Sequence, residues 1–185
     1  MTSRSAWKYG ILFPFLLVLF ALNCNTGVKQ GSLHRIQKTK KITVITRNNA
    51  HCYYTYRDEP MGFEYSLAKA FADYLGVDLT VKTFPWADMI KALNEGKGDF
   101  IAASTTITPS RKRMVDFSDE YLSIQQRVIV HEDNHTIKNL ADLNGKIIHV
   151  RKATSYEERL SELHKNGLNF SLKLHNDVPT EELIR

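Results

Sequence analysis

Three hydroxyl residues and one arginine carry the clearest chemistry in this sequence. The hydroxyls begin at Ser104, directly after the apolar run DFIAA, and Arg111 follows a Pro-Ser turn. A guanidinium presents a planar fork of donors that binds a carboxylate or a phosphate in a bidentate manner. The alternative is a surface ion pair between Arg111 and Asp116 or Asp119. Alternation along an extended chain predicts that Ser104 and Thr106 face the same way.

Two further positions have side chains suited to a ligand. Trp86 follows Pro85 at the end of a predicted strand, where the indole is either a flat wall for a ligand or a core residue. Thr154 and Ser155 lie at the predicted N-terminus of a helix, whose free N–H groups and dipole attract anions. A plain N-cap is the alternative, and the sequence also predicts a capping box between Ser155 and Glu158.

No residue pattern in the sequence indicates catalysis, a metal or a cofactor. The stretch HEDNH (131–135) formally matches a zinc-binding motif, but it follows an apolar strand and contains an Asp-Asn turn. The sequence has no P-loop, no dinucleotide-binding glycine pattern and no nucleophile elbow. We therefore predict a binding protein with no catalytic residue, no metal site and no cofactor.

The first 24 residues have the form of a secretory leader. Arg4 and Lys8 precede an apolar stretch of about 14 residues that ends at Cys24 and is too short for a membrane span. The cysteine predicts a lipoprotein acylated at Cys24, although Asn23 departs from the small residue that is usual before it. Ordinary cleavage and an uncleaved anchor are the alternatives. Each places the body of the chain outside the cytoplasmic membrane, so we expect a membrane-anchored periplasmic protein.

The chain is positively charged, but its charge pattern does not indicate a nucleic-acid partner, and we expect none. The formal net charge is +5, and part of it lies in the leader and in the QKTKK stretch that follows. The sequence has no basic stripe interleaved with aromatic residues, so a solvated surface explains the charge better than a nucleic-acid interface.

The elements that must position these residues form two α/β units. The predicted strands are 42–46, 77–84, 98–104, 124–130, 146–150 and 168–174. The predicted helices are 63–76, 85–96, 155–167 and one that begins at Pro179. Helices between strands imply right-handed crossovers and parallel sheets. The predicted domains are a leader (1–24), a tether (25–41), lobe 1 (42–130), an inter-lobe connection (131–145) and a partial lobe 2 (146–185).

Three segments together resemble the bacterial extracellular solute-binding proteins of family three. They are GFEYSLAKAFADYLGV, GKGDFIAASTTITPSRKRMVDFSDEYL and DLNGKIIHVRKATSYEERL. The resemblance implies an α/β fold of the periplasmic-binding-protein type II, with lobe 1 near complete and lobe 2 truncated. Other details resemble the branch in which such a module precedes a lysozyme-like domain that cleaves peptidoglycan.

The resemblance also implies roles for individual residues. Arg111 would bind the carboxylate of the ligand, and Trp86 would stack on the ligand. The other contacts would come from Ser104, Thr106, Thr154 and Ser155. Arg47 and Asn48 stand where many amino-acid receptors have an acid for the amine of the ligand. This departure favours a peptide or a cell-wall muropeptide at least as much as a free amino acid.

We therefore expect a periplasmic module that binds a small carboxylate-bearing solute, such as an amino acid, a peptide or a muropeptide. The alternative is an N-terminal regulatory fragment of a peptidoglycan lytic transglycosylase whose catalytic domain is absent here. A weaker alternative is the substrate-binding component of an amino-acid ABC importer. The expected partners are the small ligand, the membrane through the N-terminal anchor and, for the regulatory alternative, peptidoglycan.

Overall fold

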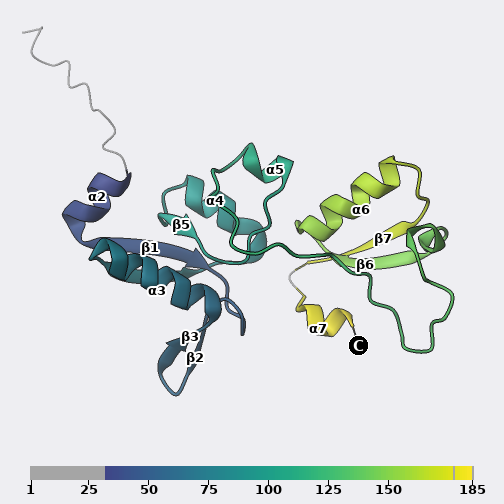
Figure 1. Cartoon of the computed structure of the whole chain (residues 1–185), viewed down its shortest axis with the longest axis horizontal. Helices are drawn as coiled ribbons and strands as arrows, with labels where there is room; N and C mark the ends of the chain where they lie inside the picture. Colours follow the sequence, from purple (N-terminus) through teal and green to yellow (C-terminus); the bar gives the residue numbers. More distant parts are fainter. Residues whose placement is uncertain (1–31, 177, 185) are drawn as a thin grey trace, which may run out of the picture.

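The computed structural model describes residues 32–176 and 178–184, which form two α/β lobes joined by extended segments (Figure 1). Lobe 1 contains α2 (Ser32–Thr39), β1 (Lys41–Thr46), β2 (Tyr54–Tyr56), β3 (Glu59–Met61), α3 (Phe63–Leu75), β4 (Asp78–Thr83), the 3-10 helix η1 (Trp86–Asp88), α4 (Met89–Asn94), β5 (Phe100–Ile101) and α5 (Pro109–Lys112). Lobe 2 contains the 3-10 helix η2 (Leu140–Leu143), β6 (Ile147–Arg151), α6 (Ser155–Lys165), β7 (Ser171–His175) and α7 (Thr180–Leu183). The predicted alternation of strands and helices is confirmed.

Lobe 1 is built on a parallel sheet with the strand order β4-β1-β5. The central strand β1 is apolar on both faces: Ile45 packs against residues of α4, whereas Ile42 and Val44 pack against residues of α3. Burial on both faces is typical of a parallel strand between two layers of helices. Gly76 has a φ of 64° and ends α3 in the left-handed conformation, which directs the chain into β4.

Lobe 2 is smaller and is covered on one side. Its two strands β6 and β7 pair in parallel, and α6 packs on one face of them. Val150, Leu160 and Phe170 form the core of this face. On the opposite face, Ile147 is 68% exposed. Lobe 2 therefore has a hydrophobic core on the α6 side, in contrast to the two-sided core of lobe 1.

The segment that leaves lobe 1 does not form the predicted strand. Residues 122–131 have no regular secondary structure, so the prediction of a strand over 124–130 is wrong. The segment runs between the lobes (Figure 1), and no strand pairs with it in the described part of the chain. A strand needs a neighbour for its backbone groups, and without one the apolar side chains Ile124 and Ile129 are 56% and 64% exposed.

Two other segments are more ordered than predicted. Residues 32–39 were expected to belong to a polar tether, but they form α2, and Ile36 is buried against Ile42 and Val77 of lobe 1. The stretch after β1, where no strand or helix was predicted before residue 63, contains an antiparallel hairpin of β2 and β3. The helix α2 therefore packs on lobe 1 from a segment ahead of the predicted boundary at residue 42.

The predicted leader, Cys24 and residues 25–31 lie outside the described residues. Between residues 32 and 184, Asp177 excepted, no helix combines the length and the apolar character needed to cross a membrane.

Candidate functional site

The candidate site lies where the carboxyl ends of the lobe 1 strands meet the start of α6. Arg47 directly follows β1, Trp86 opens η1 after β4, and the hydroxyl residues follow β5. From lobe 2, the loop after β6 leads to Thr154, which is the N-cap of α6. Ligands of open α/β sheets bind at this edge, where strands end and helices begin.

Arg111 connects the two lobes. Its backbone N–H donates to the hydroxyl of Thr108, the N-cap of α5, at 3.3 Å. The residue is 3% exposed. Its Nη1 donates to the carbonyl of Thr106 at 2.9 Å, and its Nη2 donates to the carbonyl of Ala153 in lobe 2 at 3.2 Å. The guanidinium carbon lies 5.1 Å from the centre of the Trp86 ring. Arg111 is therefore a buried residue of the lobe interface.

Three more hydrogen bonds join the predicted ligand contacts to each other, to the loop before α6 or to the connecting segment. Trp86 donates from Nε1 to the carbonyl of Ala153 at 2.7 Å. Ser155 donates from Oγ to Oγ1 of Thr106 at 3.2 Å. Gln126 of the connecting segment donates from Nε2 to Oγ of Ser155, also at 3.2 Å. Residues singled out by type and spacing in the two halves of the sequence thus lie together.

Glu158 brings a carboxylate of lobe 2 to Arg111. Its Oε2 accepts a hydrogen bond from Oγ of Ser110 at 2.6 Å, and its Oε1 lies 3.7 Å from Nε of Arg111. The predicted capping box between Ser155 and Glu158 is wrong, because Thr154 is the N-cap and its hydroxyl accepts from a backbone N–H of the first turn. Burial lowers the pKa of Arg111, and the negative charge of Glu158 opposes this shift.

Ser104 does not follow the predicted alternation with Thr106. Its φ of 53° lies in the left-handed region, which is uncommon outside glycine. Its backbone N–H and its hydroxyl both donate to Oε1 of Glu64, each at 2.6 Å. Glu64 is 1% exposed and also accepts from the hydroxyl of Tyr121 at 2.6 Å. Glu64 therefore links the loop after β5 to the start of the segment between the lobes.

Of the two predicted site residues after β1, Arg47 lies beside the other site residues and Asn48 does not. The guanidinium carbon of half-buried Arg47 lies 5.6 Å from the centre of the Trp86 ring. Asn48 is exposed, and its backbone pairs with Tyr53. Within the described residues, no hydrogen bond links the Asn48 side chain to the site.

Sequence reasoning missed three parts of this arrangement. Glu64 lies in the first turn of α3, where an acid usually stabilises the helix dipole from the surface, so its type gave no sign of burial. Ala153 contributes a backbone carbonyl at a φ of 60°, which no side-chain pattern reveals. Oγ1 of Thr105 is buried and has no hydrogen-bond partner in the described part of the chain. The sequence could have pointed to Thr105 as a site residue, because it lies between the predicted ligand contacts Ser104 and Thr106.

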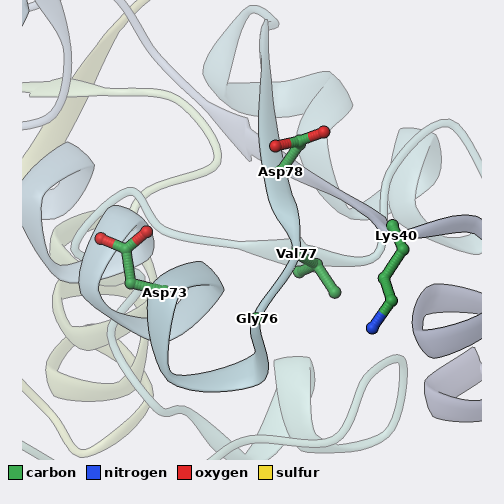
Figure 2. Close-up of a pocket in the computed structure, with 5 residues that line it drawn as sticks. All are labelled: Lys40, Asp73, Gly76, Val77 and Asp78. Carbon is green, nitrogen blue, oxygen red and sulfur yellow. The ribbon is translucent and has the colours of Figure 1, made fainter.

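Two further depressions lie on the surface of the described residues. Among the described residues, no three His, Cys, Asp or Glu side chains are placed to hold a metal ion. A depression of about 270 Å³ at the start of β4 is lined by Lys40, Asp73, Gly76, Val77 and Asp78 (Figure 2). Its charged side chains do not point toward a common centre (Figure 2). A second depression of about 440 Å³ runs along α6 and is lined by Glu157, Glu158, Ser161, Glu162 and Lys165.

Two α/β lobes that meet at strand ends and a helix N-terminus, around an arginine and an indole, define a solute-binding module of the periplasmic type. The chain belongs to the bacterial extracellular solute-binding proteins, family 3, whose sequence profile matches residues 42–177. The predicted family is thereby confirmed.

Similar proteins of known name are lytic transglycosylases. The chain is 51% identical over 153 residues to the membrane-bound lytic murein transglycosylase F of Desulfosudis oleivorans. The matched region is 83% of this chain and 34% of that protein. It is 30% identical over 178 residues to the protein of the same name from Aeromonas hydrophila subsp. hydrophila, over 96% of this chain and 36% of that protein. The chain thus spans about a third of the length of these relatives.

Similar solved structures are amino-acid-binding proteins. The ancestral amino acid-binding protein AncCDT-1, a precursor of cyclohexadienyl dehydratase, has a TM-score of 0.69 and 31% identity, over 81% of this chain and 67% of that chain. An ancestral arginine-binding protein bound to arginine has a TM-score of 0.66 and 32% identity, over 78% of this chain and 64% of that chain. These similarities confirm the predicted type II two-lobe fold.

Proposed function

We propose that this chain is a periplasmic solute-binding module that closes its two lobes on a small ligand bearing a carboxylate. The position of Arg111 carries the proposal: it is buried in lobe 1, directed at lobe 2 and stacked near Trp86. Its fork of donors suits a carboxylate. The hydroxyls of Thr106 and Ser155 and the N–H groups at the start of α6 supply further hydrogen bonds to a ligand at this place.

Amino acids, peptides and muropeptides all carry the required carboxylate. Similar solved proteins are described as bound to arginine and to glutamine, which supports a ligand of about that size. Arg47 and Asn48 occupy the region where an acid would bind the amine of an amino acid. Their presence supports a ligand whose amine is masked or bound elsewhere, such as a peptide or a cell-wall muropeptide.

Lobe closure links ligand binding to a change of shape. Trp86, Thr106 and Arg111 of lobe 1 already bond to groups of lobe 2. A ligand held between the lobes exchanges some of these direct bonds for its own contacts with both sides. It shifts the balance between open and closed forms only by the difference in its affinity for the two forms.

Calorimetric titration of Arg111→Ala tests the proposal, with amino acids and muropeptides as ligands. We expect affinity to fall at least about thirtyfold, because removing one partner of a buried charged pair costs about 2 kcal/mol or more. Arg113→Ala is the matched control, since exposed Arg113 donates to the carbonyl of Pro109 and lies two residues away. Unchanged affinity in Arg111→Ala contradicts the proposal.

Arg111→Lys separates binding from folding in this experiment. Lysine keeps the charge and most of the buried stem but lacks the planar fork. A variant with native circular dichroism and weakened binding supports bidentate recognition of a carboxylate. Full binding by Arg111→Lys shows that a point charge is enough.

The similarity to lytic transglycosylases supports a second role for the same module. The 51% identity to the Desulfosudis oleivorans protein favours a module that reports ligand binding to a peptidoglycan-cleaving domain. Sequencing of the gene beyond codon 185 tests this role. A reading frame that continues into a lysozyme-like domain with a catalytic glutamate supports it, and a stop codon there contradicts it.

The N-terminal sequence supports a membrane anchor at Cys24. An apolar leader ending in a cysteine is typical of lipoproteins, and the similar transglycosylases are named as membrane-bound. In the host cell, Cys24→Ser is expected to move the chain from the membrane fraction to the soluble fraction. Retention of this variant in the membrane contradicts acylation as the anchor.

A further inference from the structure

Among the described residues, one guanidinium of the candidate site has no counter-charge. The guanidinium carbons of Arg47 and Arg111 lie 5.6 Å and 5.1 Å from the centre of the same Trp86 ring, so they are at most about 11 Å apart. Arg111 bonds to two carbonyls and contacts Glu158. In the part of the chain that the structure describes, the guanidinium of Arg47 makes no ion pair and no hydrogen bond.

The carboxylates of the site are engaged by other groups. Glu64 is buried and accepts three hydrogen bonds from lobe 1 and the connecting segment. Glu157 accepts from a backbone N–H of the loop before α6 at 2.6 Å. Glu158 contacts Ser110 and Arg111. A half-buried cation that these carboxylates leave unpaired raises the local positive potential and favours an anionic group of a ligand.

We infer that the site takes a ligand with two acidic groups, one bound by Arg111 and the other by Arg47. The inference rests on the proposed function and specifies the chemical class of its ligand. The Trp86 ring holds both guanidinium groups by cation–π contact, and the edge of the Arg47 group keeps its donors for a carboxylate. An acidic amino acid or an acidic peptide fragment has the required pair of charges.

The same geometry disfavours a cationic ligand. An arginine ligand would bring a positive side chain close to Arg47, and like charges in a partly desolvated site repel each other. The chain is therefore expected to differ in specificity from the ancestral arginine-binding protein that it resembles in fold.

Matched ligand pairs that differ in one acidic group test the inference. Calorimetry of the purified chain compares glutamate with glutamine, aspartate with asparagine, and peptidoglycan stem peptides whose glutamate carboxylate is free or amidated. We expect the acidic member of at least one pair to bind about tenfold more tightly than its amide. Tenfold corresponds to about 1.4 kcal/mol, within the range of a hydrogen bond to a charged group.

Arg47→Gln identifies the residue responsible. We expect this variant to bind the amide member as before and the acidic member no more tightly than the amide. Arg57→Gln is the matched control, because Arg57 also stacks on an aromatic ring, 5.1 Å from the centre of Tyr56, in the turn between β2 and β3. Its ligand preference should equal that of the unmodified chain.

The outcomes separate the inference from the proposed function. Equal or tighter binding of the amides overturns the inference and leaves the proposed function standing. A preference for the acidic member that survives in Arg47→Gln also overturns the inference alone. No binding by any member of any pair overturns both.

Discussion

Lobe 1 and lobe 2 repeat the same strand-helix-strand unit but pack it differently. In lobe 1 the central strand β1 is buried on both faces, and Ile42, Val44 and Ile45 are all at most 2% exposed. In lobe 2 the pair β6-β7 has a core on the α6 side, while Ile147 on the other face is 68% exposed. Lobe 1 thus has buried residues on both faces of its sheet, whereas the buried core of lobe 2 lies on the α6 side.

The difference in packing matches a difference in what each lobe contributes to the site. Lobe 1 supplies the groups whose proposed function needs fixed geometry, namely Arg111, Arg47 and Trp86. Lobe 2 supplies the carbonyl of Ala153 and the hydroxyl of Ser155. A binding site is most precise when its charged groups lie on a rigid scaffold, and the less packed lobe is the one suited to move.

Cavity mutations in the two cores test this comparison with the largest expected effect. Ile45→Ala removes buried volume from lobe 1, where Ile45 is 0% exposed, and should lower the free energy of unfolding by about 2–5 kcal/mol. Leu160→Ala in lobe 2 should cost less, because Leu160 is 9% exposed and its core is one-sided. Hydrogen exchange measured by mass spectrometry on peptides of each lobe reports the two effects separately.

The unmodified chain and a surface variant serve as references. In the unmodified chain, β6 and β7 should exchange faster than β1 and β4, since fewer buried contacts hold them. Leu174→Ala, at a position that is 45% exposed, should change the free energy of unfolding by less than Leu160→Ala. Equal protection of the two sheets would show that the lobes are one cooperative unit.

The same comparison explains which parts of the fold could be predicted from sequence. The strand β1 was predicted at 42–46 and observed at Lys41–Thr46, because its run of β-branched residues suits a strand that is buried on both faces. The strand predicted over 124–130 also ends in a run of β-branched residues, 128–130. Pairing depends on a neighbour, which composition does not reveal, and the segment remains exposed.

The site shows the same limit at the level of single residues. Trp86 and Arg111 were identified because an indole and a guanidinium at strand ends are chemically distinctive. The capping motif predicted a local role for Glu158, whereas its partners Ser110 and Arg111 are about 50 residues away in lobe 1. Such long-range partners become visible only when the lobes are placed together.

Glu158→Gln sharpens the comparison because it removes a contact between the lobes and leaves each core intact. A ligand carboxylate competes with Glu158 for Arg111, so affinity for a carboxylate ligand should rise by up to about fivefold. That factor corresponds to about 1 kcal/mol, the upper range for a partly exposed ion pair. Glu162→Gln is the control, since Glu162 lies one turn further along α6 and pairs with Arg159. Lower affinity in Glu158→Gln would show that Glu158 binds the ligand itself.

The smallest expected effect concerns Tyr121, which begins the segment between the lobes. Partial burial raises the pKa of Tyr121 to about 12, and the hydrogen bond to Glu64 and the negative charge of Glu64 act in the same direction. The folded pKa lies above the unfolded value of about 10. The contribution to stability is therefore complete below about pH 10 and is lost as the pH rises through about 12.

Ultraviolet titration of the phenolate signal measures this effect. One of the eight tyrosines should ionise later than the others, and the late step should disappear in Tyr121→Phe but remain in Tyr56→Phe. Tyr56 is about as exposed as Tyr121, but the hydroxyl that donates to Glu64 is that of Tyr121. Unfolding by urea should show a steeper alkaline loss of stability for the unmodified chain than for Tyr121→Phe. If Tyr121→Phe keeps the late step, Tyr121 does not bond to Glu64 in solution. The connecting segment would then lack its link to the loop after β5, and movement of lobe 2 would not depend on that loop.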